Sequence, residues 1–183
     1  MIKAFAKFIF RIFGWKEINE LPPDLKKAVV IVAPHTSMWD FVVGRFGYWA
    51  LGFKPKFLIK KEVFKFPLKG ILKWAGGIPV DRSKSGNMVE NIATLFSKYD
   101  SLFITITPEG TRKLNPKWKK GFYYIALRAK VPIVLGILDY KKKEAGMRDV
   151  LYPSGDFEKD FKIIEDYYRG RTGKHPENFN LNE

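Results

Sequence analysis

The sequence predicts an α/β protein: a single domain with a mostly parallel central sheet flanked by helices, and with an amphipathic helix at its N-terminus. Three observations support this prediction. Short apolar runs, rich in β-branched residues, alternate with segments whose apolar residues recur at helical spacing. The 183 residues are the size of one ordinary domain, and neither a repeat nor a linker divides them. The first residues place basic side chains along one helical stripe.

The N-terminal segment is expected to form a helix over residues 2–13. Its basic residues Lys3, Lys7 and Arg11 are spaced four apart. Most of its remaining surface is apolar, from Ile2, Phe5, Phe8, Ile9, Ile12 and Phe13. Residues 1–15 therefore fit a membrane-surface helix whose cations lie near lipid phosphates. The alternative interpretation is a terminal helix packed on its own domain.

The remaining elements follow in alternation. Strands are expected at residues 28–33, 56–59, 78–80, 101–107 and 131–138, and helices at residues 37–51, 87–99 and 118–130. The polar segment 170–183 is expected to be a loosely ordered tail.

Composition limits the possible partners. Lys and Arg number 33 against 19 Asp and Glu, and the net charge of +14 favours nucleic acid, anionic lipid or an acidic protein as partner. Aromatic residues make up 16% of the chain, which is common where proteins meet lipid, so we favour a membrane surface. The absence of cysteine excludes disulfides and a cysteine nucleophile.

No apolar run approaches the roughly 20 residues that a spanning helix requires. The first 16 residues also lack an uninterrupted apolar stretch and a small-residue cleavage site, which argues against a secretory signal. We therefore expect a cytoplasmic protein that is peripheral on the inner face of the membrane.

The first candidate site follows the predicted strand 28–33. His35 lies at the carboxyl end of that strand, where open α/β sheets bind their ligands, and Asp40 comes five residues later. An imidazole can act as a general base near neutral pH when a carboxylate orients it. The alternative is structural, because Ser37 and Asp40 also match the capping box that begins many helices.

Two further polar clusters follow predicted strands. Glu109, Gly110, Thr111 and Arg112 come after strand 101–107, and Arg82 follows strand 78–80. An arginine offers a bidentate fork that suits phosphate, and the glycine allows a tight turn. Taken alone, either cluster could be no more than a solvated turn.

Together these segments resemble the glycerophospholipid acyltransferase family, typified by 1-acylglycerol-3-phosphate acyltransferase. That family has a His-x4-Asp motif, a block running from Gly to Arg, a Glu-Gly-Thr-Arg motif and a late Val-Pro-Ile-Val. In this sequence the motifs are, in the same order, His35 to Asp40, Gly76 to Arg82, Glu109 to Arg112 and Val131 to Val134. The resemblance covers roughly residues 28–140.

The resemblance implies transfer of a fatty acyl group from a thioester donor, either acyl-CoA or acyl carrier protein, to a hydroxyl of a lysophospholipid or glycerol-phosphate-like acceptor. His35 would be the base and Asp40 would orient it. Acceptor contacts would come from Glu109 to Arg112 and from Arg82, Ser37, Lys60 and Lys120. An anionic membrane surface is the third expected partner.

Direct transfer suits the residues available, since the chain has neither a Gly-x-Ser-x-Gly elbow nor a cysteine to form an acyl-enzyme. The sequence carries no metal-site or nucleotide-loop signature, so we expect no metal and no cofactor. Two alternatives remain: a basic nucleic-acid-binding protein without catalysis, although no known nucleic-acid module is recognisable, and a hydrolytic relative that uses water as acceptor.

Overall fold

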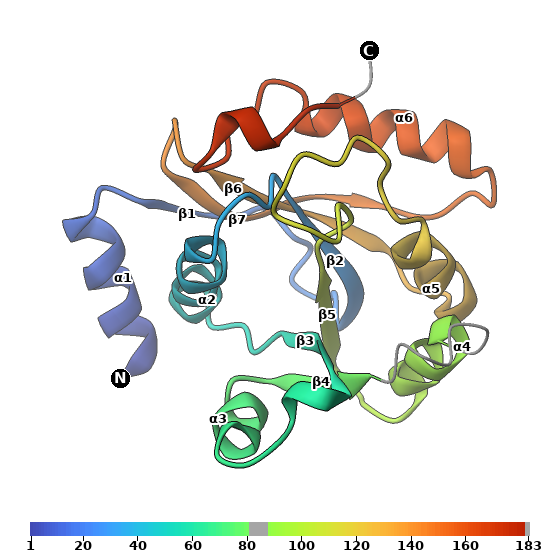
Figure 1. Ribbon diagram of the computed structural model, residues 1–183, viewed down its shortest axis with the longest axis horizontal. Helices are drawn as coiled ribbons and strands as arrows, with labels where there is room; N and C mark the ends of the chain where they lie inside the picture. The colour runs from blue at the N-terminus through green and yellow to red at the C-terminus, as the bar shows by residue number, and fades with distance from the viewer. Residues whose placement is uncertain (81–87, 182–183) are drawn as a thin grey trace.

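The strands form one sheet with helices on both faces (Figure 1). The computed structural model describes residues 1–80 and 88–181 of the chain. Its seven-stranded sheet is ordered β1-β7-β6-β2-β5-β3-β4. The strands are β1 (Lys16–Asn19), β2 (Lys27–Ala33), β3 (Lys56–Lys60), β4 (Gly77–Val80), β5 (Leu102–Ile106), β6 (Ile133–Asp139) and β7 (Glu144–Leu151).

Most of the sheet is parallel, which confirms the predicted fold class. Five strands run in one direction: β6, β2, β5, β3 and β4. β7 pairs antiparallel with β6, and β1 pairs parallel with β7. β2 and β5 are adjacent and parallel, so the segments that follow them emerge at the same edge of the sheet. The two main candidate motifs therefore meet in space.

The helices form a layer on each face of the sheet. They are α1 (Ile2–Ile12), α2 (Trp39–Leu51), α3 (Leu68–Trp74), α4 (Met88–Ala93), α5 (Gly121–Ala129) and α6 (Phe157–Tyr168), with short 3-10 turns at Lys61–Val63, Thr94–Ser97 and Pro176–Asn178. In the described part of the chain, no helix is both long enough and apolar enough to cross a membrane.

Successive side chains of β2 point to opposite faces of the sheet, so the strand contributes to a core on each face. Val29 and Ile31 pack into the larger core, together with residues of α4, α5 and α6. Ala28 and Val30 face the opposite side, where they pack with Tyr48 of α2. Buried on both faces, the strand reads as a continuous apolar run, as expected for the centre of a parallel sheet.

The predicted boundaries required small corrections. α2 begins at Trp39 rather than at residue 37, and α5 spans Gly121–Ala129 rather than 118–130. The helix expected over 87–99 is α4 followed by a 3-10 turn. Helix ends fray and tighten, so differences of this size are usual.

Four elements were not predicted: β1, α3, β7 and α6. β1 lies at the edge of the sheet with β7 next to it, and charged residues interrupt both strands, so their sequence signals are weak. Their pairing depends on Gly146, where a Cβ atom would overlap the carbonyl oxygen of Ile18. α6 did carry a signal: Phe157, Phe161, Ile164 and Tyr168 recur at helical spacing.

The segment after Gly170 contacts the domain more closely than its polar sequence predicts. Leu181 is buried in the larger core. The amide of Tyr140 donates to the carbonyl of Thr172, and the amide of His175 donates to Thr36 Oγ1 at 3.1 Å. These contacts bring residues 172–175 against the loop that carries His35.

Candidate active site

The loop between β2 and α2 carries the first candidate pair. His35 Nδ1 lies 3.1 Å from Asp40 Oδ2. Asp40 is only 5% exposed, whereas His35 is partly open to the cavity described below. Because an ionised carboxylate can only accept hydrogen bonds, Nδ1 carries the proton in this contact and Nε2 is left as the basic nitrogen.

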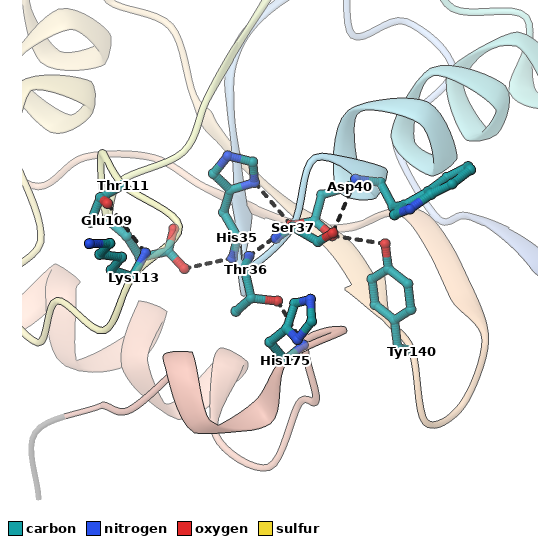
Figure 2. Close-up of polar contacts among 10 residues, drawn as sticks. His35, Thr36, Ser37, Asp40, Glu109, Thr111, Lys113, Tyr140 and His175 are labelled. Atoms are coloured by element: carbon teal, nitrogen blue, oxygen red, sulfur yellow. Dashed lines mark hydrogen bonds and ion pairs between the residues drawn. The ribbon is translucent and has the colours of Figure 1, made fainter.

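Asp40 is held by four hydrogen-bond donors. Besides His35, the amides of Thr36 and Ser37 each donate to Oδ2 at 2.8 Å, and the Tyr140 hydroxyl donates to Oδ1 at 2.8 Å (Figure 2). Burial acts to raise the pKa of Asp40, but the hydrogen bonds from His35, Ser37 and Tyr140 outweigh it and lower the pKa below its usual value. The carboxylate is therefore ionised at neutral pH.

The structure shows a contact that each interpretation of Asp40 expected, one with the Ser37 amide near the start of α2 and one with the His35 imidazole. The contact from the Ser37 amide is one of the two bonds of a capping box, although the N-cap residue of α2 is Met38. Ser37 Oγ in turn accepts from the amide of Trp39 at 3.2 Å. The Asp40 carboxylate therefore contacts both the chain just before α2 and the imidazole of His35. Ser37 is itself buried, and its hydrogen bonds support the loop.

Glu109 has a different place from the one predicted. We expected it to contact the acceptor, but it is 4% exposed and its Oε1 accepts from the backbone amide of His35 at 2.8 Å. Its Oε2 is buried without a hydrogen-bond partner among the described residues. Burial raises the pKa of Glu109 to about 7, although the amide of His35 opposes this. Glu109 thus holds the backbone of the His35 loop from the neighbouring loop that follows β5 (Figure 2).

The rest of the Glu-Gly-Thr-Arg motif is more open. Gly110 has φ +68° and lines the cavity beside His35. Thr111 and Arg112 are exposed, and Thr111 Oγ1 accepts from the amide of Lys113 at 3.2 Å.

A cavity of about 600 Å³ opens beside His35, between α2, α4, α5 and the ends of β3 and β5. Most of its lining is apolar, and its polar lining residues include His35, Asp40 and Lys119. The lining includes Phe41, Phe57, Leu58, Ile59, Val80, Met88, Ile92, Ile106, Phe122 and Ile125. A mainly apolar cavity with a few convergent polar groups is the usual form of a small-molecule site.

Of the lysines near the candidate site, Lys120 was predicted to contact the acceptor, but its neighbour Lys119 is the one that lines the cavity. Lys120 Nζ pairs with Glu158 at 2.8 Å and lies over the ring of Phe157, so it faces α6. Its neighbour Lys119 lines the cavity instead, next to Gly110. The backbone of Lys60 ends β3, and Arg82 lies outside the described residues.

Sequence reasoning missed Tyr140, Thr36 and Lys119. Tyr140 is 100 residues from Asp40 in the sequence, and no local pattern signals their contact. Lys119 lies one residue from a predicted contact, and only the turn before α5 decides which of the two lysines faces the cavity. Among the described residues, no group of three or more His, Cys, Asp or Glu could hold a metal ion.

Comparison with known proteins identifies the family of the chain. The family model for acyltransferases matches residues 15–135. A 1-acyl-sn-glycerol-3-phosphate acyltransferase of Streptococcus pneumoniae is 33% identical over 117 residues, covering 61% of this chain and 42% of the relative. One from Limnanthes douglasii is 33% identical over 121 residues, covering 62% of this chain and 41% of the relative.

The chain thus spans about two fifths of the length of these curated relatives. Among solved structures, the 1-acyl-sn-glycerophosphate acyltransferase PlsC of Thermotoga maritima shares the fold, with a TM-score of 0.61 at 17% identity over 94% of this chain and 80% of the other. The family model covers the sheet from β1 into β6, including the His35 loop and the Glu109 loop. The resemblance seen in the four motifs is confirmed, and the chain belongs to the acyltransferase family.

Proposed function

We propose that this protein transfers a fatty acyl group from a thioester donor to a hydroxyl of a lysophospholipid or glycerol-phosphate-like acceptor. The observation that carries the proposal is the His35 and Asp40 pair at the wall of a mainly apolar cavity of about 600 Å³. Family membership and the names of the relatives support the same reaction class.

His35 acts as the general base. Its Nε2 removes the proton from the acceptor hydroxyl while the oxygen attacks the thioester carbonyl carbon. The new carbon–oxygen bond forms, the carbon–sulfur bond breaks, and the proton is passed on to the departing thiolate. Asp40, ionised and held by four donors, fixes the ring and stabilises the imidazolium that forms in between.

The apolar wall of the cavity suits the acyl chain, and its polar rim suits the head group. Gly110 and Lys119 line the rim, and Arg112 lies exposed beyond Gly110. A lysine and an arginine at this position match a phosphate-bearing acceptor or the phosphates of coenzyme A. The net charge of +14 equally favours an acidic acyl carrier protein as donor.

α1 supports peripheral binding to an anionic membrane surface. Its Ala6 and Phe10 are buried against the domain, while Ile2, Phe5, Phe8 and Ile12 are exposed. The helix is thus docked on the protein by one stripe and keeps a second apolar stripe outward. An exposed apolar stripe flanked by cations suits the boundary between head groups and acyl chains.

The test is to incubate purified protein with labelled acyl-CoA or acyl carrier protein and a panel of lyso-lipids. His35→Ala should lose at least about a hundredfold in kcat, the usual contribution of a general base. His175→Ala is the matched control, because it removes the other histidine of the chain and should keep the activity.

Three outcomes would contradict the proposal. Equal product from wild type and His35→Ala would remove the role of His35. Release of free fatty acid without an acylated lipid would indicate a hydrolase. Salt-sensitive binding of RNA or DNA that survives His35→Ala, with no acyl transfer, would favour the nucleic-acid alternative.

A further inference from the structure

α3 exposes apolar side chains that the domain leaves uncovered. None of its seven residues is buried. Ile71 is 62% exposed and Trp74 is 70% exposed, and Phe66, two residues before the helix, is 96% exposed. A helix this short is marginal in water unless packing supports it, so an exposed apolar surface on it calls for a partner.

The charge around α3 indicates what that partner is. Lys61, Lys65, Lys69 and Lys73 recur every four residues through the segment and are exposed, against the single acidic residue Glu62. Long lysine side chains keep their charge in water while their stems cover apolar surface, and tryptophan prefers the boundary between lipid and water. Exposed Phe, Ile and Trp ringed by lysine therefore suit a bilayer of anionic lipid.

α3 lies on the same side of the molecule as α1. The ring of Trp74 contacts that of Trp49 on α2, with centroids 6.0 Å apart, and Trp49 in turn contacts Phe46 at 5.4 Å. Phe46 contacts Phe5 of α1 at 6.3 Å, so aromatic rings run continuously from α1 to α3. Figure 1 shows α1, α2 and α3 together, away from α5 and α6.

α3 is also joined directly to the cavity. It connects β3 and β4, whose Phe57, Leu58, Ile59 and Val80 line that cavity. Phe57 contacts Phe41 of α2, with ring centroids 5.3 Å apart, and Phe41 is itself exposed. If α3 binds a bilayer, the cavity therefore lies close to the lipid.

We propose that α3 together with Phe66 is a second membrane-inserting element, which acts with α1 to hold the cavity against an anionic phospholipid bilayer. The reason to place the cavity there rests on the proposed acyl transfer, but the lipid binding itself does not. A second copy of the chain is a poorer occupant, because a two-fold contact through α3 would bring the two sets of lysines together.

The test uses the natural absence of cysteine from the chain. Phe66→Cys and, as a control, Tyr152→Cys are each labelled with an environment-sensitive fluorophore and mixed with vesicles of phosphatidylcholine and phosphatidylglycerol. Tyr152 is an exposed aromatic residue that follows β7, outside the aromatic surface of α1, α2 and α3. We expect a blue shift at position 66 and none at position 152. No shift at position 66 when the protein sediments with the vesicles would overturn the proposal.

A second measurement removes the insertion. Phe66→Ser combined with Trp74→Ser should lower partitioning into anionic vesicles about tenfold or more, with Tyr152→Ser as control. Phe66 is 96% exposed and Trp74 is 70% exposed, with a ring contact to Trp49, so the double variant should stay folded with a Tm close to that of the wild type. Unchanged partitioning would refute the role of α3 in membrane insertion. The same holds if the only effect of the double substitution is to convert a dimer into a monomer.

The outcome separates this inference from the proposed reaction. If the wild type inserts position 66 but transfers no acyl group from any donor, the proposed function fails and the membrane element stands. If acyl transfer depends on His35 but position 66 stays in water, the proposed function stands and the membrane element fails.

Discussion

Asp40 is the residue at which the start of α2 meets the candidate active site. Its two oxygens accept from His35, from the amides of Thr36 and Ser37, and from Tyr140. A buried carboxylate with four donors is fixed in position and charge, and so fixes the tautomer of the imidazole beside it. The start of α2 is therefore part of the candidate active site.

Tyr140 is predicted to be a positioning residue. Tyr140→Phe removes one hydrogen bond to an ionised group, which is typically worth about 2 kcal/mol, so kcat should fall about tenfold or more while KM changes little. Steady-state kinetics at saturating acceptor would measure this. Tyr124→Phe, on the exposed side of α5, is the control. An equal loss in both variants would contradict the assignment.

Glu109 is predicted to make stability depend on pH. Its pKa rises from 4.5 to about 7 in the folded protein because the carboxyl is buried. The folded state therefore binds more protons than the unfolded state between these values, and stability falls as pH rises from about 4.5 to about 7. The full effect is on the order of 3 kcal/mol.

Glu109→Gln should remove this contribution, since an amide does not titrate. Urea unfolding of wild type and variant at pH 4.5, 6 and 8 would measure the difference. We expect the variant to gain stability relative to wild type as pH rises. A constant difference across this range would show that Glu109 does not titrate there.

At the level of elements, α1 packs on the domain through Ala6 and Phe10, and we propose that its exposed apolar side chains also bind the membrane surface. Phe8→Ser with Ile12→Ser changes only exposed positions and should reduce sedimentation with anionic vesicles without lowering Tm. Phe10→Ser is the matched contrast, because Phe10 is 2% exposed and its loss should destabilise the fold by about 3 kcal/mol. If all three positions behaved alike, α1 would have only one role.

α6 is held to α5 by a buried carboxylate. Asp160 accepts from the Tyr123 hydroxyl at 2.8 Å and from the Ser154 amide and hydroxyl. Asp160→Ala leaves these donors unpaired, and we expect a loss of about 3 kcal/mol in the free energy of unfolding. Chemical denaturation would measure it, with Asp166→Ala on the exposed side of α6 as control. A loss below 1 kcal/mol would show that water replaces the carboxylate.

For the whole molecule, the net charge of +14 predicts salt-dependent membrane binding. Each basic residue near an anionic surface contributes about 1 kcal/mol, and this attraction is screened within a Debye length. Raising the salt from about 0.05 M to about 0.5 M should weaken binding to anionic vesicles strongly, and neutral vesicles should bind weakly throughout. Salt-independent binding would show that apolar insertion alone suffices.

Much of the molecule was predictable from local patterns. β2, β5 and β6 are apolar runs bounded by breaks, and they were identified because a strand buried on both faces must be apolar along its length. α6 had a helical pattern that could have been used as well. β1, β7 and α3 lacked such a signal, because each is exposed on at least one side.

The sequence by itself determined the parallel α/β sheet, the position of His35 at the end of a strand and the motifs that identify the family. Those depend on periodicity and on residue type, which are local properties. Only the tertiary structure decided that Glu109 supports the His35 loop, that Lys119 rather than Lys120 faces the cavity, and that Tyr140 holds Asp40. These depend on which strands are neighbours and on where each side chain points once the sheet has formed.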